Sequence, residues 1–221
     1  MCNVYHTISQ KDDELTISTD EMTGVQALER IAEDLPMSKK KPVAREFEYM
    51  RHGTQTLIAG FDIKTGKVHG LCGDTRTEED FAFFIENTLK IYPNYKKYHF
   101  VSDQLNTHKS ETLVRLIAKH SNDNQDLGEK GKSGILQSMQ TREEYLCKGD
   151  HKIVFHYTPK HCSWLNQIEI WFGILMRKVI TRGCFISKED LKEKILTFIE
   201  YFNETMAKPF KWTYRGKPLS A

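Results

Sequence analysis

Apolar positions along the chain follow two patterns. Short runs rich in β-branched and aromatic residues, bounded by polar or turn residues, are typical of strands. Two of these runs, 54–63 and 67–73, are joined by Lys-Thr-Gly and predict a β-hairpin with glycine at the turn. The strands predicted in this way cover residues 15–20, 54–63, 67–73, 97–103 and 151–159.

Elsewhere the apolar residues recur at helical spacing. The segment 77–92 opens with a Thr-x-x-Asp capping pattern, and 187–206 opens with Ser-x-x-Asp. A further helix is predicted over 110–120. The apolar stripes of the two capped helices are Phe81, Phe84, Ile85 and Leu89, and Leu191, Ile195, Phe198 and Phe202.

The segment HCSWLNQIEIWFG (161–173) also has the character of a buried helix. On a helical wheel its apolar stripe consists of Trp164, Ile168, Trp171 and Leu175, widened by Leu165, Phe172 and Met176. Glu169 lies at the edge of this stripe beside Gly173, and Asn166 lies just beyond the glycine. A boundary glutamate of this kind often pairs with a lysine or arginine, so only acids elsewhere in the chain can favour a functional role.

The order of these elements predicts an α/β fold with a mixed central sheet flanked by helices, in which the hairpin is antiparallel and the later strands are parallel. Residues 38–53 are polar and basic, and they indicate a loop with some extended structure. Residues 121–150 are polar and rich in turn residues. Their GEKGKS sequence (128–133) has two residues between its glycines, where a phosphate-binding loop needs four, so we interpret it as part of a flexible insertion.

Composition excludes several classes of protein. The 221 residues contain no apolar run of about 18 residues and no apolar N-terminal segment, so neither a membrane span nor a secretory signal is predicted and we expect a cytoplasmic protein. The five cysteines form no Cys-x-x-Cys pair, which argues against a disulfide framework and a structural zinc site. The net charge is only +2, so any affinity for nucleic acid depends on local basic clusters.

Three acids are candidates for chemistry. Asp20 and Asp103 each end a predicted strand, and Glu169 lies at the rim of a helix. Carboxylates brought together repel one another unless a cation lies among them. Mg²⁺ prefers oxygen ligands, and two such ions can promote phosphodiester chemistry. The sequence therefore permits a metal site held by carboxylates, although periodicity alone does not show that the three acids converge.

Five segments carry a resemblance to a known family. They are STDEMTGVQALER (18–30), FEYMRHGTQTLIAGFDIKTG (47–66), VSDQLNTHKS (101–110), YTPKHCSWLNQIEIWFG (157–173) and AKPFKWTY (207–214). In this order they resemble the DDE transposases of bacterial insertion sequences, specifically the insertion-sequence family numbered six-thirty in the mariner superfamily. The resemblance implies an RNase H-like catalytic domain over residues 15–221, with 121–150 as an insertion between the second and third acids.

The resemblance also implies roles for individual residues. Asp20, Asp103 and Glu169 would be the catalytic acids and would hold two Mg²⁺ or Mn²⁺ ions. Glu21 is a weaker candidate, because neighbouring strand residues point to opposite faces. Residues that could contact DNA are Lys39, Lys40, Lys41, His108, Lys109, Lys160, Ser163, Asn166, Arg177 and Lys178.

The activity implied is hydrolysis of a DNA strand at the end of a mobile element, followed by attack of the freed 3′-hydroxyl on a target phosphodiester. The implied partners are transposon-end and target DNA and a second copy of the chain in a homodimer. The implied location is the cytoplasm, in association with the nucleoid.

The chain departs from the family pattern at three points. Glu169 follows Asp103 by 66 residues (103 to 169), a longer gap than the family usually has, and Gln104 stands where Asn is common. Residues 1–14 resemble a lead-in from an upstream helix-turn-helix region, which a separate upstream reading frame would have to supply. Two alternatives remain open: a truncated, non-catalytic remnant that binds DNA or full-length transposase, and another RNase H-like nuclease.

Overall fold

The computed structural model describes residues 1–32, 35–42 and 46–214, and it is built on one five-stranded sheet. The strands lie in the order β3-β2-β1-β4-β5. The pairs β1–β2 and β2–β3 are antiparallel, whereas β1–β4 and β4–β5 are parallel, so the predicted mixed sheet is confirmed. The strands are β1 (Glu14–Arg30), β2 (Tyr49–Asp62), β3 (Val68–Gly73), β4 (Lys97–Ser102) and β5 (Ile153–Tyr157).

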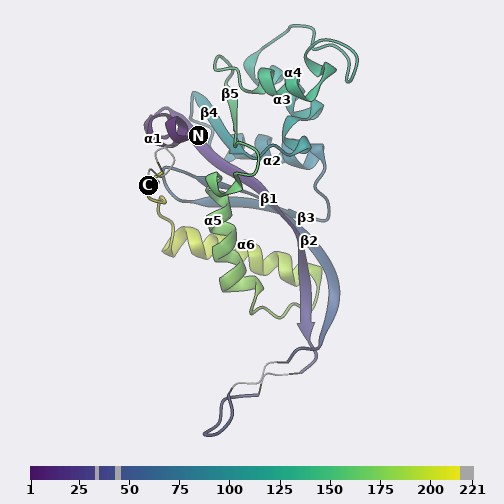
Figure 1. The fold of residues 1–221 in the computed structure, drawn as a ribbon, viewed down its shortest axis with the longest axis vertical. Helices are drawn as coiled ribbons and strands as arrows, with labels where there is room; N and C mark the ends of the chain where they lie inside the picture. The colour runs from purple at the N-terminus through teal and green to yellow at the C-terminus, as the bar shows by residue number, and fades with distance from the viewer. Residues whose placement is uncertain (33–34, 43–45, 215–221) are drawn as a thin grey trace, which may run out of the picture.

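Helices cover both faces of the sheet (Figure 1). One apolar core lies between the sheet and α5 and α6, and the other lies between the sheet and α2, α3 and α4. Side chains of β4 alternate between the two cores, since Phe100 belongs to one and Val101 to the other. The helices are α1 (Cys2–His6), α2 (Glu78–Ile91), α3 (Glu111–Ser121), α4 (Met139–Leu146), α5 (Ile168–Leu175) and α6 (Lys188–Thr205). In the described part of the chain, no helix combines the length and apolar character that a membrane span requires.

The predicted helix caps are present. Thr77 accepts a hydrogen bond from the backbone of Asp80 at the start of α2, and the Asp80 carboxylate accepts one from the backbone of Thr77. The Ser187 hydroxyl likewise accepts from the backbone of Asp190 at the start of α6. In α6 the buried residues are Leu191, Ile195, Ile199 and Phe202, and the predicted Phe198 is only partly buried.

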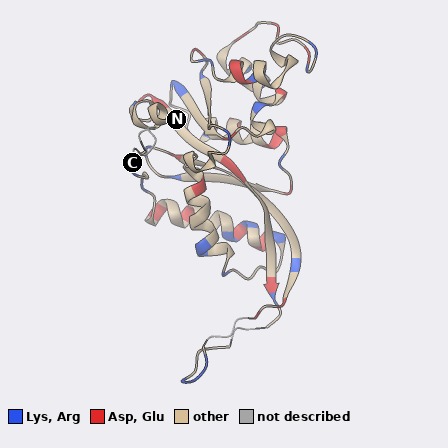
Figure 2. Cartoon of the chain, in the orientation of Figure 1, with Lys and Arg blue, Asp and Glu red and all other residues tan. Residues whose placement is uncertain are grey.

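The first two strands are much longer than predicted. β1 continues for ten residues beyond Asp20, so the expectation that this strand ends at Asp20 is wrong. The β1–β2 register has two irregularities, between Met22 and Val25 and between Gln26 and Leu28. They disturb the alternation of apolar and polar residues by which a strand is recognised in a sequence. Beyond the main sheet the two strands run on as an arm that contains residues 35–42, including Lys39, Lys40 and Lys41, and Lys or Arg positions lie at its far end (Figures 1 and 2).

The insertion between the second and third acids is folded. The expectation of a flexible loop over 121–150 is wrong, because a short 3₁₀ helix (Ile135–Gln137) and α4 lie within it. Leu136, Tyr145 and Leu146 are fully buried in the core on that side of the sheet. The buried Arg142 donates to the backbone carbonyls of Lys109 and Leu136 at 2.7 and 3.1 Å. The insertion therefore supports the loop that follows β4.

The segment that carries Glu169 begins differently from the prediction. Residues 163–165 form a 3₁₀ turn, Asn166 is extended, and the α-helix begins at Ile168. Because Trp164 precedes the helix, it does not join the buried stripe, and 53% of its surface is exposed. Ile168, Trp171 and Leu175 are fully buried as predicted.

A matched pair of glycines tests the packing of the β2–β3 turn. Gly66 has φ +75° and Gly131 has φ +77°, but a Cβ on Gly66 would lie 2.1 Å from the backbone of Lys208, whereas a Cβ on Gly131 would meet nothing within 4 Å. Left-handed backbone costs alanine about 1–2 kcal/mol at either position. We expect Gly66→Ala to lower the free energy of unfolding by at least about 2 kcal/mol more than Gly131→Ala, because the C-terminal segment must also move. Urea unfolding measures both, and equal losses would show that residue 208 does not press on the turn.

Candidate active site

The three predicted acids come from three elements that meet at the carboxyl end of β4. Asp103 directly follows this strand. The parallel β1–β4 ladder ends at the pair Ser18 and Val101, so Asp20 lies just past the point where β1 loses β4 as a neighbour. Glu169 lies in the first turn of α5. The expectation that chemistry gathers at strand ends therefore applies to the end of β4, rather than to the end of β1.

Asn166 ties the start of α5 to β1. Its side chain is fully buried, and its Nδ2 donates to the Thr19 carbonyl at 2.9 Å and to Asp20 Oδ2 at 3.1 Å. Its Oδ1 accepts from the Ser18 hydroxyl, and the same hydroxyl accepts from the backbone of Ile168 at 2.9 Å. These contacts fix the first turn of α5, and hence Glu169, relative to Asp20.

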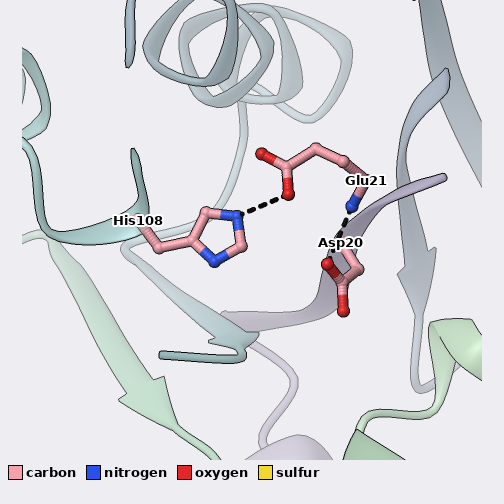
Figure 3. A group of neighbouring side chains, drawn as sticks. All are labelled: Asp20, Glu21 and His108. Atoms are coloured by element: carbon pink, nitrogen blue, oxygen red, sulfur yellow. Dashed lines mark hydrogen bonds and ion pairs between the residues drawn. The ribbon is translucent and has the colours of Figure 1, made fainter. Parts of the chain in front are cut away.

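His108 lies between two carboxylates. Its Nδ1 is 2.7 Å from Asp103 Oδ1, and its Nε2 is 3.0 Å from Glu21 Oε2. Figure 3 shows Glu21 reaching the histidine, while the adjacent Asp20 leaves the strand in a different direction. Burial alone would lower the pKa of His108, but the hydrogen bonds and charges of Asp103 and Glu21 outweigh it and raise the pKa to about 10. His108 is therefore a cation with both ring nitrogens donating.

The pKa values of the three acids show that they share one electrostatic environment. Burial and the charge of Asp103 raise the pKa of Asp20 to about 7. Burial and the same charge also raise the pKa of Glu169. Burial works to raise the pKa of Asp103 as well, but hydrogen bonds from His108 and from the backbone of Leu105 outweigh it and hold the pKa below its ordinary value. Asp103 is thus the acid whose charge acts on both of the others.

This donor set fits a hard divalent cation. All three candidate ligands are carboxylates, and a cation among them would relieve the repulsion that raises the pKa of Asp20 and Glu169. Among the described residues, the group whose ligand atoms all lie within 4.8 Å of one another is Asp20, Glu21 and His108. In that group His108 uses both nitrogens for the carboxylates, so we assign it to support of the acids rather than to metal ligation.

Comparison with known proteins identifies the family. The family model described as DDE superfamily endonuclease matches residues 16–192. The chain is a member of the DDE superfamily endonucleases. No protein of curated function matches it.

Solved structures similar to this DDE endonuclease include those of the Mos1 transposase. The Mos1 mariner paired-end complex with Mn has a TM-score of 0.50 and 11% identity, and the match covers 92% of this chain and 57% of the Mos1 chain. The Mos1 strand transfer complex has a TM-score of 0.48 and 11% identity, with 92% and 56% covered. This chain therefore spans less than two thirds of the Mos1 chain. The first of these matches confirms the predicted RNase H-like fold.

The DNA-contact candidates of the endonuclease separate into two groups. His108, Lys109 and Asn166 are buried and present no surface to DNA. Lys109 is bound inside the protein to Glu143 at 2.6 Å and lies over the ring of Tyr157. The other candidates are exposed: Lys160, Ser163, Arg177 and Lys178 around α5, and Lys39, Lys40 and Lys41 on the arm.

Sequence reasoning missed two contributors to the site. Ser18 has no catalytic chemistry of its own, and its role follows only from its contacts with Asn166 and Ile168. Glu21 was a weaker candidate because it should point away from Asp20, and its function appears only once His108 is placed beside it.

The raised pKa of Asp20 predicts a pH dependence of stability in the absence of metal. The pKa of Asp20 is about 7 in the folded chain, and its ordinary value, which applies to the unfolded chain, is 3.8. Between about pH 4 and 7 the folded chain therefore keeps a proton on Asp20 that the unfolded chain has lost. The free energy of unfolding should therefore fall as pH rises through this window, and Asp20→Asn should flatten the fall. Urea unfolding in EDTA from pH 4.5 to 7.5 measures both slopes. Asp190→Asn is the control, because its pKa is lowered by Lys194, and equal slopes for wild type and Asp20→Asn would contradict the prediction.

Proposed function

We propose that this chain is the catalytic part of a transposase, which cleaves DNA at the ends of a mobile element and joins the freed end to target DNA. The observation that carries the proposal is the hydrogen bond by which Asn166 joins Asp20 to the start of α5, the helix that carries Glu169, in a member of the DDE superfamily endonucleases. The insertion-sequence family numbered six-thirty is the source that the sequence motifs favour.

Asp20, Asp103 and Glu169 would hold Mg²⁺ or Mn²⁺, and we propose two ions. Bound divalent ions would supply Lewis acidity at the phosphodiester and stabilise the attacking and leaving oxygens. The similar Mos1 structure is a paired-end complex with Mn.

The chain's own residues then have separable tasks. Asp103, whose pKa is held low, stays ionised and offers a permanent negative charge. Asn166 holds Asp20 and the start of α5 in register. Cation binding would lower the pKa of Asp20 and release its proton near neutral pH. Glu169, in the first turn of α5, is exposed and would supply the third carboxylate.

DNA would bind across α5 and along the arm. We propose phosphate contacts for Lys160, Ser163, Arg177 and Lys178, which are exposed around the helix that carries Glu169, and for Lys39, Lys40 and Lys41. A homodimer would hold two transposon ends.

A cleavage assay tests the proposal. The 221-residue chain is incubated with a supercoiled plasmid that carries the genomic DNA flanking its gene, in Mn²⁺, in Mg²⁺ and in EDTA. We expect metal-dependent nicks at the element ends with 3′-hydroxyl termini, and ends joined to other plasmid DNA. Nicks without any joined products would favour a different RNase H-like nuclease. DNA binding without cleavage, by a folded chain in either metal, would favour the non-catalytic remnant.

A further inference from the structure

We propose that Glu21 and His108 are positioning residues that set the orientation of the Asp103 carboxylate. The inference rests on the proposed function, because it assigns Asp103 a ligand role. The consecutive acids of β1 would then divide the work: Asp20 would serve as a ligand, and Glu21, whose carboxylate lies within 4.8 Å of both the Asp20 carboxylate and the His108 ring, would act through the histidine. No chemistry is assigned to Glu21 or His108 themselves.

The contacts from Glu21 through His108 to Asp103 form a bridge, and its Glu21 and His108 side chains are closed to solvent. His108 is 0% exposed and the Glu21 side chain only 2%, whereas the Asp103 side chain is 37% exposed. The two contacts of the ring, 3.0 Å to Glu21 and 2.7 Å to Asp103, use both of its nitrogens. The bridge thus runs from a buried anchor on β1 to a half-exposed carboxylate at the end of β4.

His108 is held both at its ring and at its backbone. Phe81 of α2 packs against it with the ring centroids 4.2 Å apart. The hydroxyl of Tyr157, on β5, donates to the His108 carbonyl at 2.6 Å, and the His108 backbone donates to the Leu105 carbonyl at 3.1 Å. A histidine that merely filled the core would not need a carboxylate at each nitrogen.

These contacts select one oxygen of Asp103. Oδ1 accepts from the Leu105 backbone at 2.9 Å and lies against His108 Nδ1. Within residues 1–32, 35–42 and 46–214, Oδ2 has neither a hydrogen bond nor an ion pair. Pinning Oδ1 stops the carboxylate from turning and leaves Oδ2 for a cation, which is how outer partners orient metal ligands. Without the bridge, the half-exposed side chain would sample other rotamers and lose affinity for the cation.

Glu21 offers a conservative test of this role. Glu21→Gln keeps an oxygen that can accept from His108 Nε2, whereas Glu21→Ala removes the anchor. His108→Asn keeps a donor that can reach Asp103 and loses the contact with Glu21, and His108→Ala loses both contacts. The matched control is His99→Asn. His99, on β4, is also a buried histidine, with Glu14 at 2.8 Å and His156 at 2.9 Å, and in the described part of the chain its ring has no hydrogen bond or ion pair with any of the three acids.

Isothermal titration with MnCl₂ in the absence of DNA measures the affinity directly, and a melting curve in EDTA checks that each variant is folded. We expect Glu21→Ala and His108→Ala to weaken Mn²⁺ binding by about 10- to 100-fold. Glu21→Gln and His108→Asn should lose less, and His99→Asn should bind as the wild type does. Where His108→Ala does not fold, the Glu21 pair decides.

Asp103→Asn separates this inference from the proposed function. If Asp103→Asn loses Mn²⁺ affinity while Glu21→Ala and His108→Asn keep that of the wild type, the positioning role is overturned and the metal site stands. If His99→Asn loses as much as the Glu21 variants, the effect is general destabilisation and the role is again overturned. If Asp103→Asn binds Mn²⁺ as well as the wild type, the proposed metal site fails and the positioning role fails with it.

Discussion

Replacing Glu169 with glutamine is expected to abolish metal-dependent DNA cleavage, by a factor of about 1,000 or more, and to leave the fold intact. A thousandfold loss corresponds to about 4 kcal/mol of transition-state stabilisation, in the range expected for a ligand charge at a metal site. The cost to stability should be small, because in the described part of the chain the Glu169 carboxylate accepts no hydrogen bond. Its pKa is raised by burial and by the charge of Asp103, so a neutral amide even relieves repulsion.

The measurement is the initial rate of plasmid nicking in Mn²⁺, together with the melting temperature in EDTA. The matched control is Glu200→Gln, which neutralises an exposed glutamate of α6 away from the acids. We expect Glu169→Gln to melt at or slightly above the wild-type temperature, the pattern of a functional residue that is not optimised for stability. Retention of the wild-type nicking rate would remove Glu169 from the site.

Much of the architecture could be predicted from local pattern. The hairpin, the capped helices α2 and α6, and the strand that ends in Asp103 all follow from periodicity and turn chemistry within short windows. The mixed sheet follows from the order of these elements. Asp103 was identifiable for the same reason, because a strand followed by a polar acid is a local signal.

The features that were not predicted depend on distant residues. β1 does not stop at Asp20, because β2 continues to pair with it beyond the last residue of β4. Helix α5 begins at Ile168 instead of 161, because the side chain of Asn166 bonds to β1, almost 150 positions away in the sequence, and leaves the helical path. The role of Glu21 depends on a histidine 87 positions later. Helical wheels and strand alternation consider only residues that are close in sequence, so they do not predict such contacts.

Asn166 is the residue at which the fold and the site are most tightly joined, and Asn166→Ala is expected to damage both. The substitution leaves the buried Ser18 hydroxyl without its acceptor and the Thr19 carbonyl without the amide donor. Unsatisfied buried groups of this kind cost about 1–3 kcal/mol each, so we expect the free energy of unfolding to fall by about 3 kcal/mol. Asp20 also loses a hydrogen bond, and the start of α5 loses its tie to β1.

Asn203→Ala provides the comparison, because Asn203 also joins a helix to a strand. Its side chain donates to the Val68 carbonyl at 2.6 Å and accepts from the Val68 backbone at 2.8 Å, on the edge strand β3, which β2 separates from β1. Asn203 is only partly buried, so water can replace some of the lost hydrogen bonds, and we expect the free energy of unfolding to fall by about 1–2 kcal/mol.

Urea unfolding measures the loss of stability in both variants, and titration with Mn²⁺ gives the second readout. Asn166→Ala should weaken Mn²⁺ binding and Asn203→Ala should not, since only Asn166 holds Asp20 and Glu169 in register. Equal Mn²⁺ affinities for the two variants would mean that the cation does not depend on the tie between β1 and α5.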